Sequence, residues 1–304
     1  MLARIQKLIT LTAWLCAMAW LESQWQQQPW HAIAGLVLIT FGYALPLGIQ
    51  FMALRWLNRR EPLARPTAGT LLRAWLDEVW ADAKLFYWRQ PFRSNRWPDH
   101  LPDQNEKTAR RGIIFIHGFI CNRGFWNPWL AQLEHSGHAC IALNLEPVFG
   151  SIDGYVPQLE EAVVRMKQAT GMAPILVCHS MGGLVARAWM RAAKADDRIQ
   201  HVFTIGSPHH GTWLGRFSLV INGWQMREVS PWLQQLEADE PMQRRAKFTC
   251  FYSNCDNIVA PALSGTLEGA LNLHVAGAGH VVLAYEKQVM QAVFGSLDSE
   301  VRKT

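Results

Sequence analysis

Two long apolar stretches open the chain. Residues 8–21 and residues 32–54 contain no charged side chain. The second stretch is long enough, at about 1.5 Å per residue, to cross a bilayer core about 30 Å thick. A buried core helix of that length would need apolar cover on all sides, which residues 1–65 do not supply. The pattern predicts an N-terminal membrane anchor over residues 1–65, built as a hairpin of two transmembrane helices.

Basic residues around the two stretches predict their orientation. The connecting segment 22–31 contains no Lys or Arg, whereas basic side chains precede the first stretch and follow the second: Arg4, Lys7, Arg55, Arg59, Arg60 and Arg65. Basic flanks stay on the cytoplasmic side of a membrane. Ala17-Met18-Ala19 could also mark a signal-peptidase site, so cleavage of the first stretch stays open. By either route, we expect the rest of the chain to lie in the cytoplasm.

Residues 66–111 read as an amphipathic helix followed by a polar connector. Within 70–90, apolar residues recur at helical spacing and share one stripe: Leu72, Trp75, Leu76, Val79, Ala83 and Phe86. Such a helix packs on the rest of the protein or lies at the membrane interface, and the pattern leaves both open.

From residue 112 onward, short apolar runs alternate with helical patterns. The expected strands are 112–117, 139–143, 174–179, 200–205, 247–253 and 271–275, and the expected helices lie near 124–136, 155–170, 181–195 and 281–294. This alternation predicts an α/β domain over 112–296, with a mostly parallel sheet covered on both faces. An apolar insert at about 211–245 interrupts it and is either a helical lid over the site or simple helical padding.

Ser180 stands between an apolar run and a helical pattern, in Cys178-His179-Ser180-Met181-Gly182. A strand, a tight turn with serine at its tip and a helix hold a hydroxyl exposed above a parallel sheet. Cys178 departs from the usual G-x-S-x-G pattern, although a side chain of its size fits the crowded turn. We interpret Ser180 as a nucleophile, which needs a base within hydrogen-bond reach.

His280 is the predicted base, because it lies in a glycine-rich loop after the last strand. A third group must orient that imidazole, and Asp256, in the loop after the preceding strand, suits the role. The chain order Ser180, Asp256, His280 is the order of α/β hydrolases. Asp153, Asp239 and Glu146 compete less well for the acid, Asp153 because it precedes the serine.

Backbone N–H groups must meet the charge that develops on the substrate carbonyl oxygen. We expect those of Phe119 and Met181, one after an early strand and one after the nucleophile. Gly118 lets the loop approach closely, and we assign supporting roles to His117, His179 and Gly182.

These motifs resemble the α/β-hydrolase superfamily, and within it bacterial lipases and esterases of the triacylglycerol lipase type. The resemblance covers about residues 110–296, including His117-Gly118-Phe119, the turn around Ser180 and Ile205-Gly206-Ser207-Pro208-His209-His210-Gly211-Thr212. It implies an α/β-hydrolase fold and hydrolysis of carboxylic esters of lipids or acyl chains. It does not extend to residues 1–65, whose apolar stretches are the reason that we expect the protein at a bacterial inner membrane. A thioesterase, an acyltransferase, a polyester depolymerase and a membrane scaffold with an inactive hydrolase domain remain alternatives.

Composition adds little to this interpretation. The net charge of +5, with Arg crowded beside the second apolar stretch, suits anionic lipid better than nucleic acid. No metal-ligand spacing and no phosphate-binding glycine motif is present, so we expect no cofactor. Some related lipases bind calcium near the catalytic His, but no Asp lies between Asp256 and Asp298 here, and we expect no metal. Nothing indicates an obligate protein partner.

Overall fold

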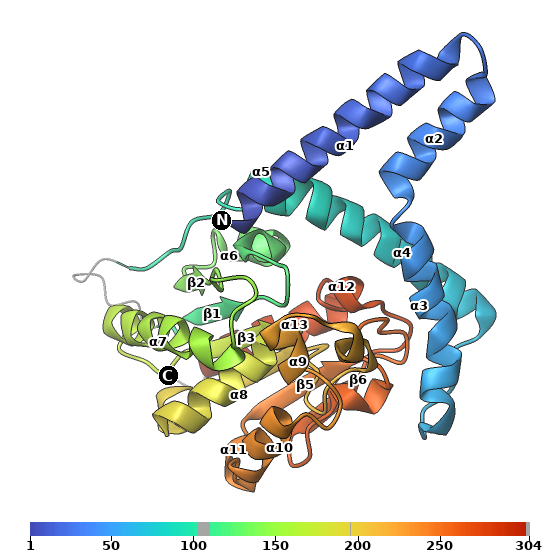
Figure 1. The fold of residues 1–304 in the computed structure, drawn as a ribbon. Helices are drawn as coiled ribbons and strands as arrows, with labels where there is room; N and C mark the ends of the chain where they lie inside the picture. The colour runs from blue at the N-terminus through green and yellow to red at the C-terminus, as the bar shows by residue number, and fades with distance from the viewer. Residues whose placement is uncertain (103–109, 195, 302–304) are drawn as a thin grey trace.

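A single parallel sheet forms the centre of the protein. The computed structural model describes residues 1–102, 110–194 and 196–301 (Figure 1). Its strand order is β2-β1-β3-β4-β5-β6, and every neighbouring pair is parallel. The strands are β1 (Ile113–Ile116), β2 (Cys140–Ala142), β3 (Ile175–His179), β4 (His201–Ile205), β5 (Phe248–Tyr252) and β6 (Leu271–His274). All six predicted strands are therefore present, and the α/β prediction is confirmed.

Helices cover both faces of this sheet. Alternate strand residues point to opposite faces, so Ile114 and Leu176 pack with α7 and α8, whereas Ile113 and Ile175 pack with α6 and α13. The helices of this part are α6 (Asn127–Leu133), α7 (Val156–Thr170), α8 (Met181–Ala193), α12 (His280–Leu283) and α13 (Lys287–Val301), with short 3₁₀ turns η3 (Arg123–Trp126), η4 (Ile152–Tyr155), η5 (Asp196–Arg198) and η7 (Ala262–Gly265). The helix expected over 281–294 is thus two helices. The carbonyl of Ala284, where the first one ends, accepts a hydrogen bond from the Trp129 indole.

The N-terminal third is mainly helical. Its elements are α1 (Leu2–Trp25), α2 (Pro29–Phe41), α3 (Ala44–Leu57), η1 (Asn58–Arg60), α4 (Ala68–Lys84), the π-helical turn η2 (Leu85–Arg89) and α5 (Gln90–Arg93). Helices α1 and α2 pack side by side and project from the domain (Figure 1). Among the described residues, only α1 is long and apolar enough to cross a membrane by itself.

The second apolar stretch is not the single helix that its pattern suggested. It divides into α2 and α3, and the two parts are bent by 61° at the break. The reason lies in α3, which packs onto the domain instead of continuing the projection. Phe51 and Leu54 of α3 are buried with Leu71 of α4 and with Ala260, in the loop after β5. Asn58 then donates a hydrogen bond to the Asn254 carbonyl.

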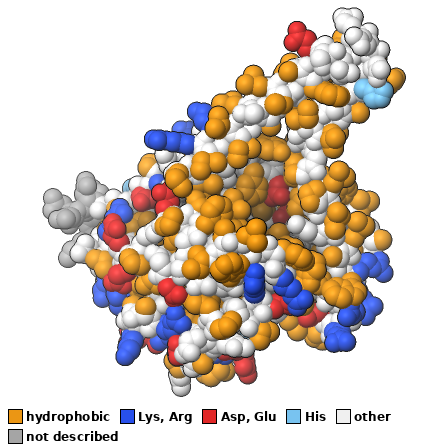
Figure 2. Space-filling view, viewed as in Figure 1, with side chains coloured by type: hydrophobic (Ala, Val, Ile, Leu, Met, Phe, Trp, Pro, Cys, Tyr) orange, Lys and Arg blue, Asp and Glu red, His pale blue; other side chains and the backbone are white. Residues whose placement is uncertain are grey.

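Helix α4 also differs from its predicted stripe. Leu72 and Leu76 are 55% and 53% exposed, and the buried face instead carries Leu71, Ala74 and Glu78. Leu72, Leu76 and Trp80 of α4 are exposed apolar side chains, and hydrophobic side chains also cover much of the molecular surface below the projecting α1–α2 pair (Figure 2). One face of α4 therefore packs on the domain while its other face offers apolar surface to the surroundings.

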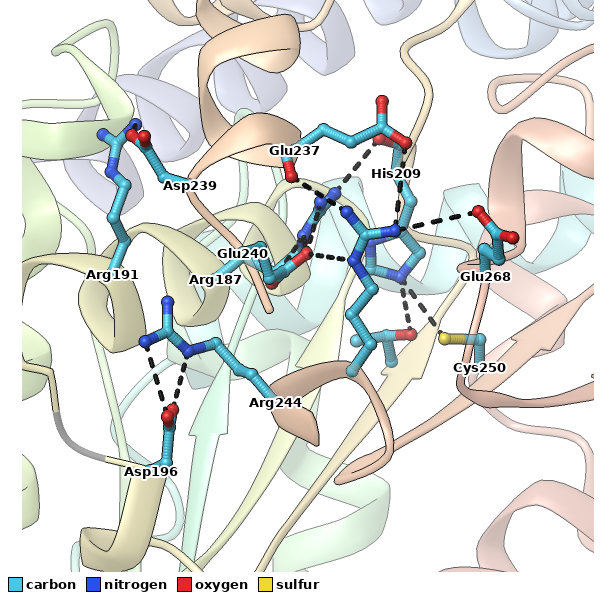
Figure 3. A network of polar contacts seen from close by, with 12 residues as sticks. Arg187, Arg191, Asp196, His209, Glu237, Asp239, Glu240, Arg244, Cys250 and Glu268 are labelled. Carbon is cyan, nitrogen blue, oxygen red and sulfur yellow. Dashed lines mark hydrogen bonds and ion pairs between the residues drawn. The ribbon is translucent and has the colours of Figure 1, made fainter. Parts of the chain in front are cut away.

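A buried ion pair fixes the base of the 211–245 insert, which contains η6 (Trp213–Phe217), α9 (Ile221–Gln225), α10 (Pro231–Ala238) and α11 (Met242–Arg245). Arg187 of α8 contacts Glu240, after α10, at 2.7 Å (Figure 3). Arg187 also donates to the carbonyl of His209. Because these charges are paired and hydrogen-bonded, the pair tolerates burial and holds the insert to the core.

Candidate active site

Ser180 occupies a sharp turn directly after β3. Its φ of 54° lies in the left-handed region, which a non-glycine residue adopts only where the surroundings impose it. The Ser180 N–H donates to the carbonyl of Ile205 at the end of β4, which fixes the turn against the sheet. Gly118 passes close by, because a Cβ at that position would lie 2.7 Å from the Ser180 Cβ. The turn and the loop after β1 thus meet at the serine.

His280 and Asp256 are paired. The Nδ1 of His280 lies 2.9 Å from Asp256 Oδ2 and 3.0 Å from Oδ1. The carboxylate also accepts the N–H groups of Ile258 and Val259, at 2.9 and 2.7 Å, so its orientation is fixed by its own loop. A neutral imidazole that donates from Nδ1 presents Nε2 as its acceptor. This is the tautomer that a general base needs.

The three other candidates for the acid that orients His280 form ion pairs elsewhere in the structure. Asp153 pairs with Arg191 at 2.8 Å, and Asp239 contacts the same arginine at 3.6 Å. Glu146 contacts the N-terminal amine of Met1 at 2.6 Å. Of the four acids considered from the sequence, Asp256 is the one that contacts His280.

His117 and His179 are buried and hold backbone groups. The N–H of Leu145 donates to His117 Nε2, so its Nδ1 carries the proton and donates to the Gly118 carbonyl at 2.9 Å. Burial lowers the pKa of His117 to about 4. Burial also lowers the pKa of His179, whose Nε2 donates to the His280 carbonyl at 3.2 Å. Both rings are therefore neutral at physiological pH and act as backbone supports.

The predicted oxyanion donors flank the serine. Met181 begins α8 directly after Ser180, with Gly182 buried in the same first turn. Phe119 follows Gly118 and lines the cavity that contains Ser180. The N–H groups of the two residues belong to the two segments that meet at the serine. Among the described residues, no group of three or more His, Cys, Asp or Glu side chains could hold a metal ion.

A mainly apolar cavity of about 220 Å³ contains both Ser180 and His280. Its wall includes Leu47 of α3 and Glu78, Asp82 and Phe86 from α4 and η2. None of its lining residues comes from the 211–245 insert, so the lid role of that insert stays a prediction. The N-terminal helices were predicted as an anchor and as a helix that packs on the protein or lies at the membrane interface; in the structure they form one side of this cavity.

Sequence reasoning missed Glu78 and Asp82. Neither residue belongs to the predicted apolar stripe, yet Glu78 is 1% exposed and Asp82 lines the cavity. Burial raises the pKa of Glu78 to about 7 and that of Asp82 to about 8. The available signal was their spacing of four residues, which places two acids on one helix face.

The sequence is similar to known lipases over part of its length. Residues 113–231 match the family described as alpha/beta hydrolase fold. A triacylglycerol lipase of Pseudarthrobacter phenanthrenivorans is 32% identical over 120 residues, which cover 36% of this chain and 37% of that protein. A triacylglycerol lipase of Burkholderia plantarii is also 32% identical over 120 residues, or 36% of this chain and 33% of that protein. The match thus spans about a third of each relative.

Solved structures extend the likeness in fold to about two thirds of the chain. The mature form of Bacillus licheniformis lipase BlEst2 has a TM-score of 0.55 at 18% identity, covering 66% of this chain and 95% of that one. Aspergillus fumigatus lipase B has a TM-score of 0.57 at 16% identity, covering 68% of this chain and 57% of that one. Identities this low establish the fold alone. Together with the sequence matches, they identify the chain as an α/β-hydrolase-fold protein that resembles lipases and esterases.

Proposed function

We propose that this protein hydrolyses carboxylic esters of lipids or other acyl chains through a Ser180–His280–Asp256 triad. The observation that carries the proposal is that one apolar cavity contains both Ser180 and His280, with Asp256 hydrogen-bonded to Nδ1 of the imidazole. The similarity to triacylglycerol lipases supports the same reaction class.

In this mechanism, Ser180 Oγ attacks the ester carbonyl while His280 takes its proton. Asp256 keeps the imidazole in the required tautomer and stabilises the imidazolium that forms. The N–H groups of Phe119 and Met181 receive the developing oxyanion. His280 then returns the proton to the leaving alcohol, and water attacks the acyl-enzyme by the reverse sequence to release the acid.

Attachment to a bacterial inner membrane, with the catalytic domain in the cytoplasm, completes the proposal. Its support is the long apolar helix α1, the basic residues flanking both apolar stretches and the exposed apolar side chains of α4. An enzyme held at a bilayer works beside a lipid substrate that is concentrated in two dimensions.

The Ser180→Ala variant tests the chemistry. We expect it to lose hydrolysis of p-nitrophenyl butyrate by at least about 1,000-fold, because the loss of a triad member leaves only binding and oxyanion stabilisation. It should also fail to react with a fluorophosphonate probe while its thermal unfolding is unchanged. Ser136→Ala, at a loop remote from the cavity, is the matched control. Wild-type activity in Ser180→Ala would refute the triad.

A further inference from the structure

We propose that Glu78, on α4 of the N-terminal segment, is a positioning residue for His280. The inference rests on the proposed hydrolase function and assigns the N-terminal segment a part in it. Glu78 lies about two hundred residues before the histidine in the chain, yet its side chain ends at the same short helix, α12.

The carboxyl of Glu78 binds the two residues that follow His280. Its Oε1 accepts the N–H of Val281 at 2.7 Å, and its Oε2 accepts the N–H of Val282 at 3.0 Å. These N–H groups belong to the first turn of α12, where no intrahelical acceptor is available. One buried carboxyl therefore satisfies two backbone donors and fixes the direction in which α12 leaves the loop.

The fit between Glu78 and this loop is close. A Cβ at Gly279 would lie 2.5 Å from Glu78 Oε2, so only glycine leaves room for the carboxyl. The N–H of His280 itself donates to Asn257 Oδ1 at 3.2 Å, and the Nδ2 of Asn257 donates to Gln50 Oε1 of α3 at 2.8 Å. Side chains from outside α12 therefore hold three successive amides, 280 to 282.

The imidazole position follows from this arrangement. Asp256 fixes the ring through Nδ1, but the ring can face Ser180 only if the backbone of residue 280 is also fixed. Glu78 supplies that constraint without touching the reacting atoms. A catalytic group displaced by about 1 Å can lose on the order of 100-fold in rate, so weakening this contact is expected to slow catalysis in a protein that still binds substrate.

Glu78→Gln tests the proposal in the full-length protein. The amide keeps one acceptor oxygen and turns its NH₂ against the second N–H donor. We expect kcat for p-nitrophenyl butyrate to fall about 10- to 100-fold with KM unchanged. The rate of fluorophosphonate labelling at Ser180 should fall in parallel, since that reaction also needs His280. Asp77→Asn, an exposed acid one residue earlier on α4, is the matched control and should behave as wild type.

Two further outcomes keep the test decisive. If Glu78→Gln does not fold, Glu78→Asp retains the carboxylate on a shorter side chain and should show an intermediate loss of kcat, again at constant KM. A folded Glu78 variant with wild-type kcat, or one in which KM alone changes, overturns the positioning role. Inactive wild-type and Asp77→Asn proteins would instead contradict the proposed function.

Discussion

Asp82 is a carboxyl in an unusual environment. It lines the cavity beside Ser180 and His280, and its Oδ1 is buried without a hydrogen-bond partner among the described residues. Burial is the main cause that raises its pKa to about 8, and the neighbouring carboxyl of Glu78 adds to the effect while His280 opposes it. At neutral pH, Asp82 is therefore mainly protonated, which keeps this part of the cavity wall uncharged.

This raised pKa predicts a pH-dependent stability. The folded state binds the Asp82 proton more tightly than the unfolded state. The contribution of this proton to the free energy of unfolding is therefore complete at low pH and is lost as pH rises from about 4 to about 8. Asp82→Asn has no proton to lose and should gain stability over wild type across that range. We expect the variant and the wild type to have equal melting temperatures near pH 4 and the variant to have the higher one at pH 8. Each kcal/mol of difference in the free energy of unfolding corresponds to a difference of about 2–4 °C in melting temperature.

Asp77→Asn again serves as the control, because its carboxyl is exposed. A melting-temperature difference between Asp82→Asn and wild type that is the same at both pH values would contradict the assignment.

Residue-level prediction from the sequence was uneven for physical reasons. Ser180, Asp256 and His280 each follow a strand of one parallel sheet, and the carboxyl ends of such strands meet at one edge. Their convergence could therefore be anticipated, and the short His280–Asp256 distance agrees with it. Glu78 could not be found in this way, because its partners are backbone N–H groups, which leave no mark in the sequence.

At the scale of elements, α3 and α4 form a wall of the catalytic cavity. A second cavity of about 300 Å³ lies between them and is bounded by Tyr43 and Tyr87. Leu47, Asp82 and Phe86 line both cavities, so the two adjoin at these three residues. An acyl chain that leaves Ser180 in this direction would pass Leu47 before it reaches the second cavity.

Leu47→Trp should therefore change chain-length preference. A larger side chain at the neck leaves room for a butyryl group but obstructs longer chains, and we expect kcat/KM for p-nitrophenyl palmitate to fall at least about tenfold while the butyrate value changes little. Leu219→Trp, at an 88% exposed position of the 211–245 insert, tests the alternative that this insert acts as a lid and controls access to the cavity. If that variant alone alters the preference, the insert and not α3 controls access.

The bend between α2 and α3 shows what periodicity does not reveal. An apolar run records only that its side chains avoid water, and either lipid or a protein core satisfies that requirement. Within residues 32–54, Phe51 and Leu54 pack on the domain whereas Val37 and Leu38 stay exposed, so one part of the run is explained by the protein core and the other is not. The strands of the sheet were predictable because their runs are short, buried and separated by clear turns.

At the scale of the whole molecule, the length of the projecting pair matters. Leu2, Gln6 and Thr10 of α1 are buried against the domain, and Trp14 stacks on Phe92 of α5, so about residues 15–25 project, over about 16 Å. Helix α2 has 13 residues, or about 20 Å. Both lengths are below the bilayer core of about 30 Å. A pair that entered the bilayer only part of the way would bury its polar tip, around Gln26, Gln27 and Gln28, in hydrocarbon, which is costly. If the apolar face of α4 also enters the near leaflet, the pair sits deeper and its tip reaches the far surface. We therefore expect the pair to cross the membrane with α4 partly inserted.

Cysteine labelling in intact cells measures this topology. In a Cys16→Ser background, where the other five cysteines are buried, we expect Gln27→Cys to react with a membrane-impermeant maleimide from outside. Leu219→Cys should react only after lysis. Protection of Gln27→Cys until lysis would mean that the pair does not cross, and labelling of Leu219→Cys in intact cells would reverse the proposed orientation.

The two hydrogen bonds between Glu78 and the backbone after His280 have a practical consequence for the preparation of this protein. Removing the apolar N-terminal helices to obtain a soluble fragment that begins at β1 would also remove the α3–α4 wall of the cavity. It would remove the Glu78 carboxyl that holds the backbone next to His280 as well. Such a fragment would keep the sheet, Ser180, Asp256 and His280. A substrate screen with it would nevertheless detect no hydrolysis, and that result would say nothing about the full-length protein. Detergent or lipid nanodiscs are therefore a better route to a soluble sample than truncation of the N-terminal helices.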